Sequence, residues 1–357
     1  MLRGPELLAE EGTQKVTPQD LVERAAVVLV FVMGLLFGSF LNVVIARVPH
    51  DQSIVTPRSR CPRCGHQLAW YENIPVVSWL ALRARCSSCG LPISWRYPLI
   101  ELLTALLFLA CQRRFGWTPE LVSGLVLVLL LVPLAFIDLE HWILPFELTL
   151  PGIATGLALS VPLGLERLID SAIGAAAGFF VFWGLEWLGE KIFKKEALGG
   201  GDKYLLALIG AFLTWKPLLG VIFLSSLQGA VVGIVMLLIR GRAGPAPEPE
   251  TPTDSTPAAT PDPATPPAVM PPPVTGETST ASPATADPAA PPGAEQAGTE
   301  RTDEEDADEE EDDWVPGPTN IPFGPWLSVA ALEVMLLGPW LQSVLPMPID
   351  VLLTGVR

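Results

Sequence analysis

Long apolar runs separated by shorter polar segments dominate the pattern along this chain. A helix needs roughly 20 apolar residues to cross a hydrocarbon layer of about 30 Å, and it satisfies its own backbone polar groups in lipid. The pattern therefore predicts an all-α polytopic membrane protein with about eight transmembrane helices. The eight apolar windows cover residues 26–46, 98–112, 119–137, 148–164, 168–188, 204–215, 217–239 and 325–345.

The polar stretches between these windows set the expected domain boundaries. We expect no cleavable signal peptide, because the first residues are polar and no small-residue cleavage site follows the first apolar window. The segments are an N-terminal polar tail at 1–25, a first transmembrane helix at 26–47, a cysteine-containing loop at 48–97, a transmembrane core at 98–242, a Pro-rich acidic insert at 243–320, and a last transmembrane helix with the C-terminus at 321–357.

The net charge of −16 belongs to one of these segments. Between Ala243 and Asn320 the chain has 18 Asp and Glu residues against Arg301, whereas the remaining residues together carry a net charge of +1. The segment also has 18 of the 37 prolines. Such a sequence buries too little apolar surface to offset the entropy of ordering. We therefore expect a disordered linker, with a binding tail that includes Trp314 as the alternative.

Lysine and arginine residues predict the orientation, because the cytoplasmic loops of membrane proteins are enriched in both. With eight spans and an outer N-terminus, the inner loops have 13 of these residues, seven of them arginines between Arg47 and Arg96. The outer segments have 8. This bias places the cysteine-containing loop, Asp138 and Asp202 on the cytoplasmic side.

Four cysteines in the loop form two C-x-x-C pairs, Cys61 with Cys64 and Cys86 with Cys89, separated by 21 residues. Four thiolates at such spacings form a closed tetrahedral site for structural zinc. The alternatives are two disulfides or a redox pair, and a cytosolic loop disfavours lasting disulfides. The remaining Cys111 ends an apolar window, and we interpret it as an inert apolar residue. We predict that zinc organises the loop without taking part in chemistry.

Two aspartates stand at the edges of apolar windows, where an ionisable group is costly and marks a functional site by default. Asp138 ends the third window, and Asp202 closes the run Gly199-Gly200-Gly201-Asp202. The glycines allow positive φ and a close approach of the backbone to a substrate. Two carboxylates that lie together cannot both ionise easily, so one can draw a proton from water while the other polarises a peptide carbonyl. Taken singly, each aspartate also fits a helix cap; their shared side favours catalysis.

Other hydrolytic chemistries lack their residues in this sequence. There is no H-E-x-x-H, no G-x-S-x-G and no P-loop, and His50, His66 and His141 are too dispersed to predict a catalytic zinc. Ser39 follows Gly38 inside the first window, where small residues are typical of helix packing rather than of a nucleophile. The expected surroundings are the lipid bilayer, with no nucleic-acid partner.

Several short motifs follow one another in a specific order along the chain. They are Gly38-Ser39-Phe40-Leu41-Asn42-Val43-Val44, Glu72-Asn73-Ile74-Pro75 to Ser78-Trp79-Leu80, both cysteine pairs, Ile93-Ser94-Trp95-Arg96-Tyr97-Pro98, Glu101-Leu102-Leu103-Thr104, Phe136-Ile137-Asp138, Gly199 to Asp202, and Ile321-Pro322-Phe323-Gly324-Pro325. With these motifs the chain resembles the type IV prepilin leader peptidases, the bifunctional membrane aspartic peptidases and N-methyltransferases of pilus and type II secretion systems. The resemblance covers about residues 30–345 except the insert.

The resemblance implies that Asp138 and Asp202 are the catalytic aspartates and that the four paired cysteines form a cytoplasmic zinc-binding loop beside a peptidase core. It implies cleavage of prepilins and pseudopilins just after a glycine that precedes a hydrophobic helix, at the cytoplasmic face of the bacterial inner membrane. It also implies methylation of the new N-terminus, usually a phenylalanine, with S-adenosylmethionine as methyl donor. The residues that bind S-adenosylmethionine and the oligomeric state stay unassigned.

Three positions depart from the family pattern. A Pro-Asp pair usually follows the first aspartate, but Pro145 is followed by Phe146, which leaves Asp138 as the candidate for the dyad. The lysine that usually stands two residues after the second aspartate is Lys203, directly adjacent to it. The family pattern Leu-Arg-Gly-Arg-Cys has Ala84 in place of the glycine, a position that the resemblance associates with methyl transfer.

Two alternatives remain beside the bifunctional enzyme. One is a related G-x-G-D intramembrane aspartic peptidase without methyltransferase activity, which the cysteine pairs argue against. The other is a membrane scaffold or carrier with a zinc loop and no catalysis, in which both aspartates are replaceable.

Overall fold

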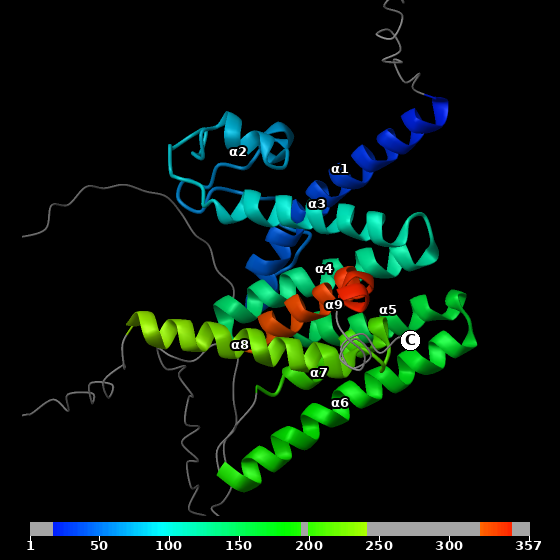
Figure 1. Ribbon diagram of the computed structural model, residues 1–357. Helices are drawn as coiled ribbons and strands as arrows, with labels where there is room; N and C mark the ends of the chain where they lie inside the picture. The colour runs from blue at the N-terminus through cyan, green and yellow to red at the C-terminus, as the bar shows by residue number, and fades with distance from the viewer. Residues whose placement is uncertain (1–16, 194–198, 241–321, 345–357) are drawn as a thin grey trace, which may run out of the picture. The chain divides into compact units, whose positions relative to one another are not determined.

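The computed structural model describes residues 17–193, 199–240 and 322–344. The expected insert and most of the expected N-terminal tail lie outside the described residues. Within these ranges the protein is nearly all helical, with two isolated antiparallel bridges as its β-structure. The helices in Figure 1 are α1 (Pro18–Arg47), α2 (Val77–Ala81), α3 (Arg96–Phe115), α4 (Pro119–His141), α5 (Phe146–Ser160), α6 (Leu165–Phe193), α7 (Asp202–Leu213), α8 (Leu218–Arg240) and α9 (Gly324–Val344), with the short 3-10 helices η1 (Val48–His50), η2 (Trp70–Asn73) and η3 (Val161–Leu163).

Five helical stretches in the described ranges are long and apolar enough to cross a membrane, and the protein is accordingly a polytopic helical membrane protein. The other three expected windows correspond to α3, α7 and α9. With 12 residues, α7 is too short to span a bilayer, since a helix rises only about 1.5 Å per residue. The number eight therefore stays a prediction. The five stretches are Pro18–His50, Pro119–His141, Phe146–Leu163, Leu165–Ile192 and Leu218–Leu238.

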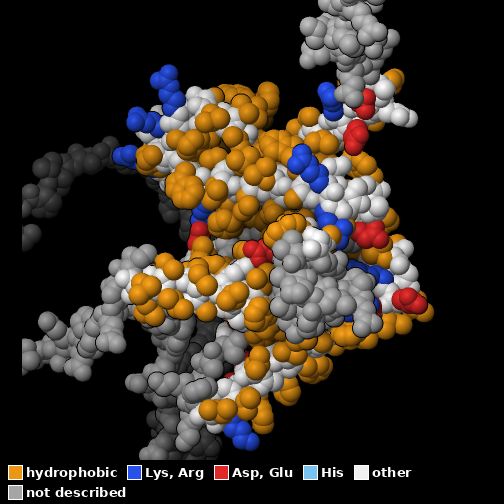
Figure 2. All heavy atoms as spheres, in the orientation of Figure 1, with side chains coloured by type: hydrophobic (Ala, Val, Ile, Leu, Met, Phe, Trp, Pro, Cys, Tyr) orange, Lys and Arg blue, Asp and Glu red, His pale blue; other side chains and the backbone are white. Residues whose placement is uncertain are grey.

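The distribution of side chains on the surface fits a membrane environment. Hydrophobic side chains cover much of the face shown in Figure 2, and Lys and Arg side chains stand out over the loop between α1 and α3. Exposed apolar area of this extent is rare on soluble monomeric proteins and marks contact with lipid or a partner.

The first helix begins inside the stretch that we expect to be a polar tail. Thr17 and Asp20 form a reciprocal capping box, in which the Asp20 N–H donates to Thr17 Oγ1 and the Thr17 N–H donates to Asp20 Oδ2. Pro18 occupies the first helical turn, where its missing N–H costs nothing. The apolar window thus marks only part of α1, because the cap starts the helix among polar residues.

Helices α1 and α3 pack closely along one another. At Gly38 a Cβ atom would lie 2.6 Å from the Cα of Glu101, so only glycine permits this approach. Asn42 Nδ2 donates to the carbonyl oxygen of Tyr97 at 3.2 Å, which joins the two helices near their ends. Because the cysteine-containing loop connects α1 to α3, this packing brings the two ends of the loop together.

The short helix α7 lies at the centre of the helical core. Its residues from Leu205 to Phe212 are all buried, and it contacts α4, α5, α6, α8 and α9. Gly210 of α7 faces Gly174 of α6 with no room for a Cβ atom on either residue. A helix this enclosed positions its first residue, Asp202, with little freedom.

Candidate active site and metal centre

Asp138 lies in the last turn of α4 and is 5% exposed. The helix ends here because Trp142 adopts a left-handed conformation with φ 60°, and its N–H donates to the Asp138 carbonyl oxygen at 3.0 Å. Oδ2 of the Asp138 side chain accepts no hydrogen bond from any described residue. A buried carboxylate oxygen without a partner is costly, and it indicates a place for water or substrate.

Asp202 is the first residue of α7 and is 6% exposed. Its N–H donates to the Gly199 carbonyl oxygen at 3.1 Å, which closes the glycine turn. None of the three glycines has a positive φ, contrary to our expectation. Close packing is the reason for at least one of them, since a Cβ at Gly201 would lie 2.7 Å from the Cβ of Leu144. The turn therefore presses against the segment that follows α4.

The structure brings the two aspartates together. Their carboxylates are close enough for the charge of Asp138 to act on Asp202, and the helices that carry them are in contact. Two buried carboxylates within electrostatic reach of each other do not both ionise easily, so one can keep its proton while the other is charged. The arrangement can therefore supply both a base and an acid at one place.

Lys203, next to Asp202, does not point its charge at the dyad. Its Nζ lies 2.7 Å from Oε2 of Glu186 on α6, and both side chains are mostly buried. The negative charge of Glu186 also acts on Asp202. The ion pair thus neutralises a third carboxylate near the site and fastens the start of α7 to α6.

The four cysteines gather in the loop between α1 and α3. Their sulfur atoms all lie within 4.8 Å of one another, and none of the four is in a disulfide. A tetrahedral zinc site with Zn–S bonds of about 2.3 Å places its sulfurs roughly 3.8 Å apart, and the Sγ atoms of Cys61 and Cys89 are 3.7 Å apart. The cluster can therefore hold a zinc ion.

The two halves of the cluster are built alike. Each contains an isolated antiparallel bridge, and the glycine after its second cysteine, Gly65 or Gly90, has φ 70°. In both halves the glycine N–H donates to the carbonyl oxygen of the first cysteine at 3.0 Å. The repeated sequence C-x-x-C-G encodes this turn, because glycine adopts the left-handed conformation without strain.

The thiols of the cluster differ in their affinity for a proton. The backbone N–H groups of Cys64 and Arg63 lower the pKa of Cys61 to about 6. The Leu91 N–H lowers the pKa of Cys89, but burial and the other thiols outweigh it and raise that pKa to about 11. A bound zinc ion would remove this conflict, because it would stabilise all four groups as thiolates.

Glu72 connects the two halves of the loop, a role that the sequence did not reveal. Hydrogen bonds from Ser87, the Ala69 N–H and His66 lower its pKa to about 2. Its Oε2 accepts from the Ala69 N–H at 2.8 Å and lies 3.1 Å from His66 Nε2. Because His66 follows the first cysteine pair and Ser87 lies within the second, the buried carboxylate holds both pairs beside η2.

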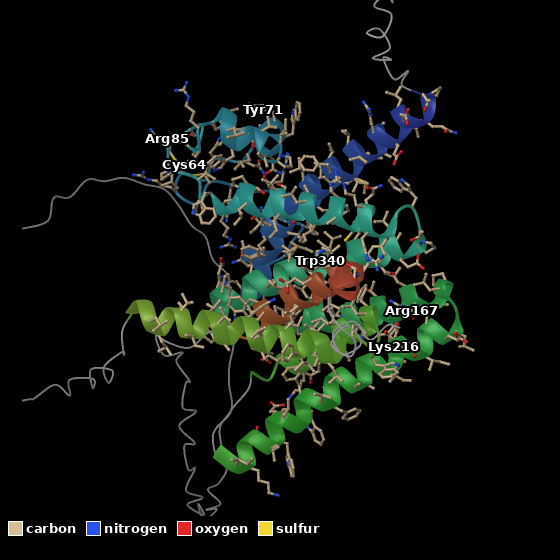
Figure 3. The ribbon with its side chains drawn as sticks, in the orientation of Figure 1. Cys64, Tyr71, Arg85, Arg167, Lys216 and Trp340 are labelled. Atoms are coloured by element: carbon tan, nitrogen blue, oxygen red, sulfur yellow. The ribbon has the colours of Figure 1, made fainter. Side chains whose placement is uncertain are left out.

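Two contacts join the loop to the end of α4 that carries Asp138. Arg96, the first residue of α3, forms an ion pair with Glu140, and the rings of His50 and His141 meet edge to face at 5.3 Å. In Figure 3 the labelled Cys64 and Arg85 lie in this loop. The labelled Arg167 marks the opposite end of α7 from Asp202, because it donates to the carbonyl oxygen of Phe212. The base of the loop and the two aspartates therefore lie at the same end of the helices.

Glu101 is a second residue whose role the sequence did not reveal. It is buried in α3, and its Oε2 accepts the Val76 N–H at 2.7 Å. Val76 has φ 60°, a rare conformation for a β-branched residue. The signal available in the sequence was a glutamate near the edge of an apolar window, which is costly unless it has a partner.

Two protein families match the chain. The bacterial peptidase A24 N-terminal domain matches residues 32–115, and the type IV leader peptidase family matches residues 125–234. A prepilin leader peptidase/N-methyltransferase of Myxococcus xanthus (strain DK1622) is 58% identical over 329 residues, which is 92% of this chain and 95% of that protein. The proteins of the same name from Aeromonas hydrophila and Pseudomonas aeruginosa are 43% and 39% identical, over 63% and 64% of this chain and 86% and 87% of their own lengths. No solved structure matches the chain. The chain therefore belongs to the type IV leader peptidase family.

Proposed function

We propose that this protein removes the leader peptide of prepilins and pseudopilins and then methylates the new N-terminus, with Asp138 and Asp202 as the catalytic pair. Membership of the family and the name shared by its relatives support both reactions. The burial of both aspartates within electrostatic reach of each other is the observation that carries the peptidase assignment. A scaffold or carrier does not need this proximity.

Hydrolysis follows from the protonation of the pair. The charged carboxylate takes a proton from a water molecule, which attacks the scissile carbonyl carbon, while the protonated carboxylate donates a hydrogen bond to the carbonyl oxygen. The proton then passes to the leaving amine as the peptide bond breaks. The two residues titrate as a unit, so we assign the roles to the pair and not to single residues.

The charge distribution supports an active site on the cytoplasmic side. The Arg96–Glu140 ion pair connects the cysteine-containing loop to the end of α4 that carries Asp138. Seven arginines lie in this region from Arg47 to Arg96, and arginine-rich loops stay in the cytoplasm. Because the base of the loop and both aspartates lie at one end of the helices, the loop's orientation sets that of the site. The protein is then a multi-pass protein of the bacterial inner membrane that cuts at the cytoplasmic face.

Zinc in the cysteine cluster has a structural role in this proposal. The four cysteine sulfurs would fill all four tetrahedral positions of the ion, so none would be open to water or substrate. Cys61, Cys64, Cys86 and Cys89 would hold the ion and shape the loop. S-adenosylmethionine enters as a substrate that supplies the methyl group.

An assay of the purified full chain in lipid nanodiscs tests both reactions. The substrate is a peptide with a basic leader, a glycine and a hydrophobic segment that starts with phenylalanine, given with and without S-adenosylmethionine. Mass spectrometry should show cleavage after the glycine in both cases and one added methyl group only with the donor. An uncleaved peptide contradicts the peptidase assignment. Cleavage without methylation supports a peptidase that lacks the second activity.

The second candidate, a peptidase without methyltransferase activity, depends on the effect of one residue in the loop. Ala84 stands where the family pattern has glycine, and it has φ 57°. A non-glycine residue in the left-handed region costs roughly 1–2 kcal/mol. The loop of this chain therefore keeps the backbone conformation of a glycine while carrying an alanine.

We expect Ala84→Gly to stabilise the loop by about 1 kcal/mol, since it relieves the left-handed strain at a small entropic cost. Thermal unfolding of the purified protein measures the effect. Ala69→Gly is the matched control, because Ala69 lies in the same loop at φ −69° and should lose stability on substitution. A destabilised Ala84→Gly variant would mean that Ala84 is not strained. Methyl transfer that appears only in this variant would show that the alanine disables the second reaction.

A further inference from the structure

One matched motif has no role so far, the segment from Pro322 to Pro325 at the start of α9. It lies beyond both regions that match a family, which end at residues 115 and 234. The structure places it against the candidate dyad: α9 packs on α4 and also contacts α7. The first residue of α9, Gly324, lies against Asp138.

Gly324 touches the side chain of Asp138. A Cβ atom at this position would overlap Oδ2 of Asp138 and would lie 3.1 Å from its Cγ and 3.4 Å from Cδ2 of Leu205. Leu205 is one turn after Asp202 on α7. Gly324 is thus wedged between the carboxylate of one aspartate and the helix that carries the other, and no side chain fits there.

The backbone of Gly324 also faces the carboxylate. Its N–H interacts with Asp138, whereas the next free N–H groups of α9, those of Trp326 and Leu327, already donate to the Phe323 carbonyl oxygen. Pro325 has no N–H. The Gly324 N–H is therefore the donor that the amino end of α9 presents to Asp138, and the positive end of a helix favours a nearby negative charge.

The second oxygen of the carboxylate remains open. Oδ2 of Asp138 is buried and accepts no hydrogen bond from any described residue. Because Gly324 lacks a side chain, the Asp138 carboxylate can lie directly against the start of α9. A methyl group at residue 324 would overlap Oδ2 and push the carboxylate aside.

We infer that Gly324 is a positioning residue of the peptidase site: the amino end of α9 orients the Asp138 carboxylate through its backbone and leaves Oδ2 free for the reaction. The inference rests on the proposed function, because it needs Asp138 to be catalytic. The competing explanation is that Gly324 only allows α9 to pack, as Gly38 allows α1 to pack on α3.

The test compares Gly324→Ala with Gly233→Ala, a control on α8 at which a Cβ would meet nothing within 4 Å. Each variant is purified in nanodiscs, and three quantities are measured: kcat and KM for cleavage of the prepilin peptide, methyl transfer to a peptide that is already cleaved, and the melting temperature. We expect Gly324→Ala to lower the kcat of cleavage about a hundredfold, the effect of a misplacement near 1 Å. Its KM, methyl transfer and melting temperature should match those of the control.

Three other results would overturn the inference. Wild-type cleavage that persists in Gly324→Ala overturns the inference and leaves the proposed function intact. A parallel loss of cleavage, methyl transfer and thermal stability also overturns it, because the glycine then serves packing. Absence of cleavage by the wild-type protein overturns the proposed function, and the inference with it.

Discussion

Asp138→Asn and Asp202→Asn should each abolish leader cleavage while methyl transfer to an already cleaved peptide continues. Asparagine keeps the size of the side chain but neither takes a proton from water nor donates one to the leaving amine. Loss of a positioned acid or base costs up to about ten-thousandfold in rate. Since the two residues act as a unit, the double variant should be hardly slower than either single variant.

The measurement is the initial rate of peptide cleavage, followed by mass spectrometry. Asp170→Asn is a suitable control, because the substitution is chemically the same. Asp170 lies on α6 and pairs with Lys216, which follows the far end of α7 from Asp202. The control should cleave at the wild-type rate. Either asparagine variant at that rate would remove its residue from the catalytic pair, and both at that rate would favour a carrier or scaffold without catalysis.

The cysteine cluster is predictable from the sequence because its signal is local. Two C-x-x-C pairs at metal-binding spacing require only that the chain fold back once between them, and the glycine after each pair already encodes the turn. The helices are predictable for the same reason, since apolar windows report directly on burial in lipid or core. The boundaries of the helices are less predictable. The capping box at Thr17 starts α1 among polar residues, outside any apolar window.

Contacts between segments that are distant along the chain leave no such local signal in the sequence. Glu186 lies in the apolar stretch of α6, and nothing nearby in the sequence indicates that it pairs with Lys203 beside the dyad. Gly324 follows a long polar insert, and its approach to Asp138 depends on how α4, α7 and α9 pack. The two aspartates could be singled out because a charge at an apolar edge is costly, but their surroundings come from tertiary packing.

The same limit applies to the number of spans. Hydropathy treats α7 as a candidate for crossing the membrane, yet its 12 residues are enclosed by five other helices. An apolar run of that length is equally typical of a buried core helix. Only the packing can distinguish the two, and α7, which begins at Asp202, packs against five other helices.

Removal of zinc is expected to unfold the loop between α1 and α3 and leave the transmembrane helices folded. Within residues 48–97, all of which the structure describes, only Cys61, Glu72 and Pro75 are buried. A segment with so small a core depends on a metal or disulfides for its stability. Structural zinc supplies about 10–16 kcal/mol of apparent binding energy in comparable sites.

We expect elemental analysis to find one zinc ion per chain in the wild-type protein and none in Cys64→Ala. Trypsin should then cut the loop at its exposed arginines, while helical circular dichroism stays near the wild-type value. We expect methyl transfer to be lost, because the family associates it with the loop at the position of Ala84. Cleavage should be reduced less, because the Arg96–Glu140 and His50–His141 contacts connect the loop to the end of α4 without reaching the aspartates themselves. Cys111→Ala is the control: this cysteine is buried in α3, outside the cluster, so its removal should leave the zinc content at one. A Cys64→Ala loop that resists trypsin as well as the control does would mean that Glu72 and its hydrogen bonds suffice to hold the two cysteine pairs together.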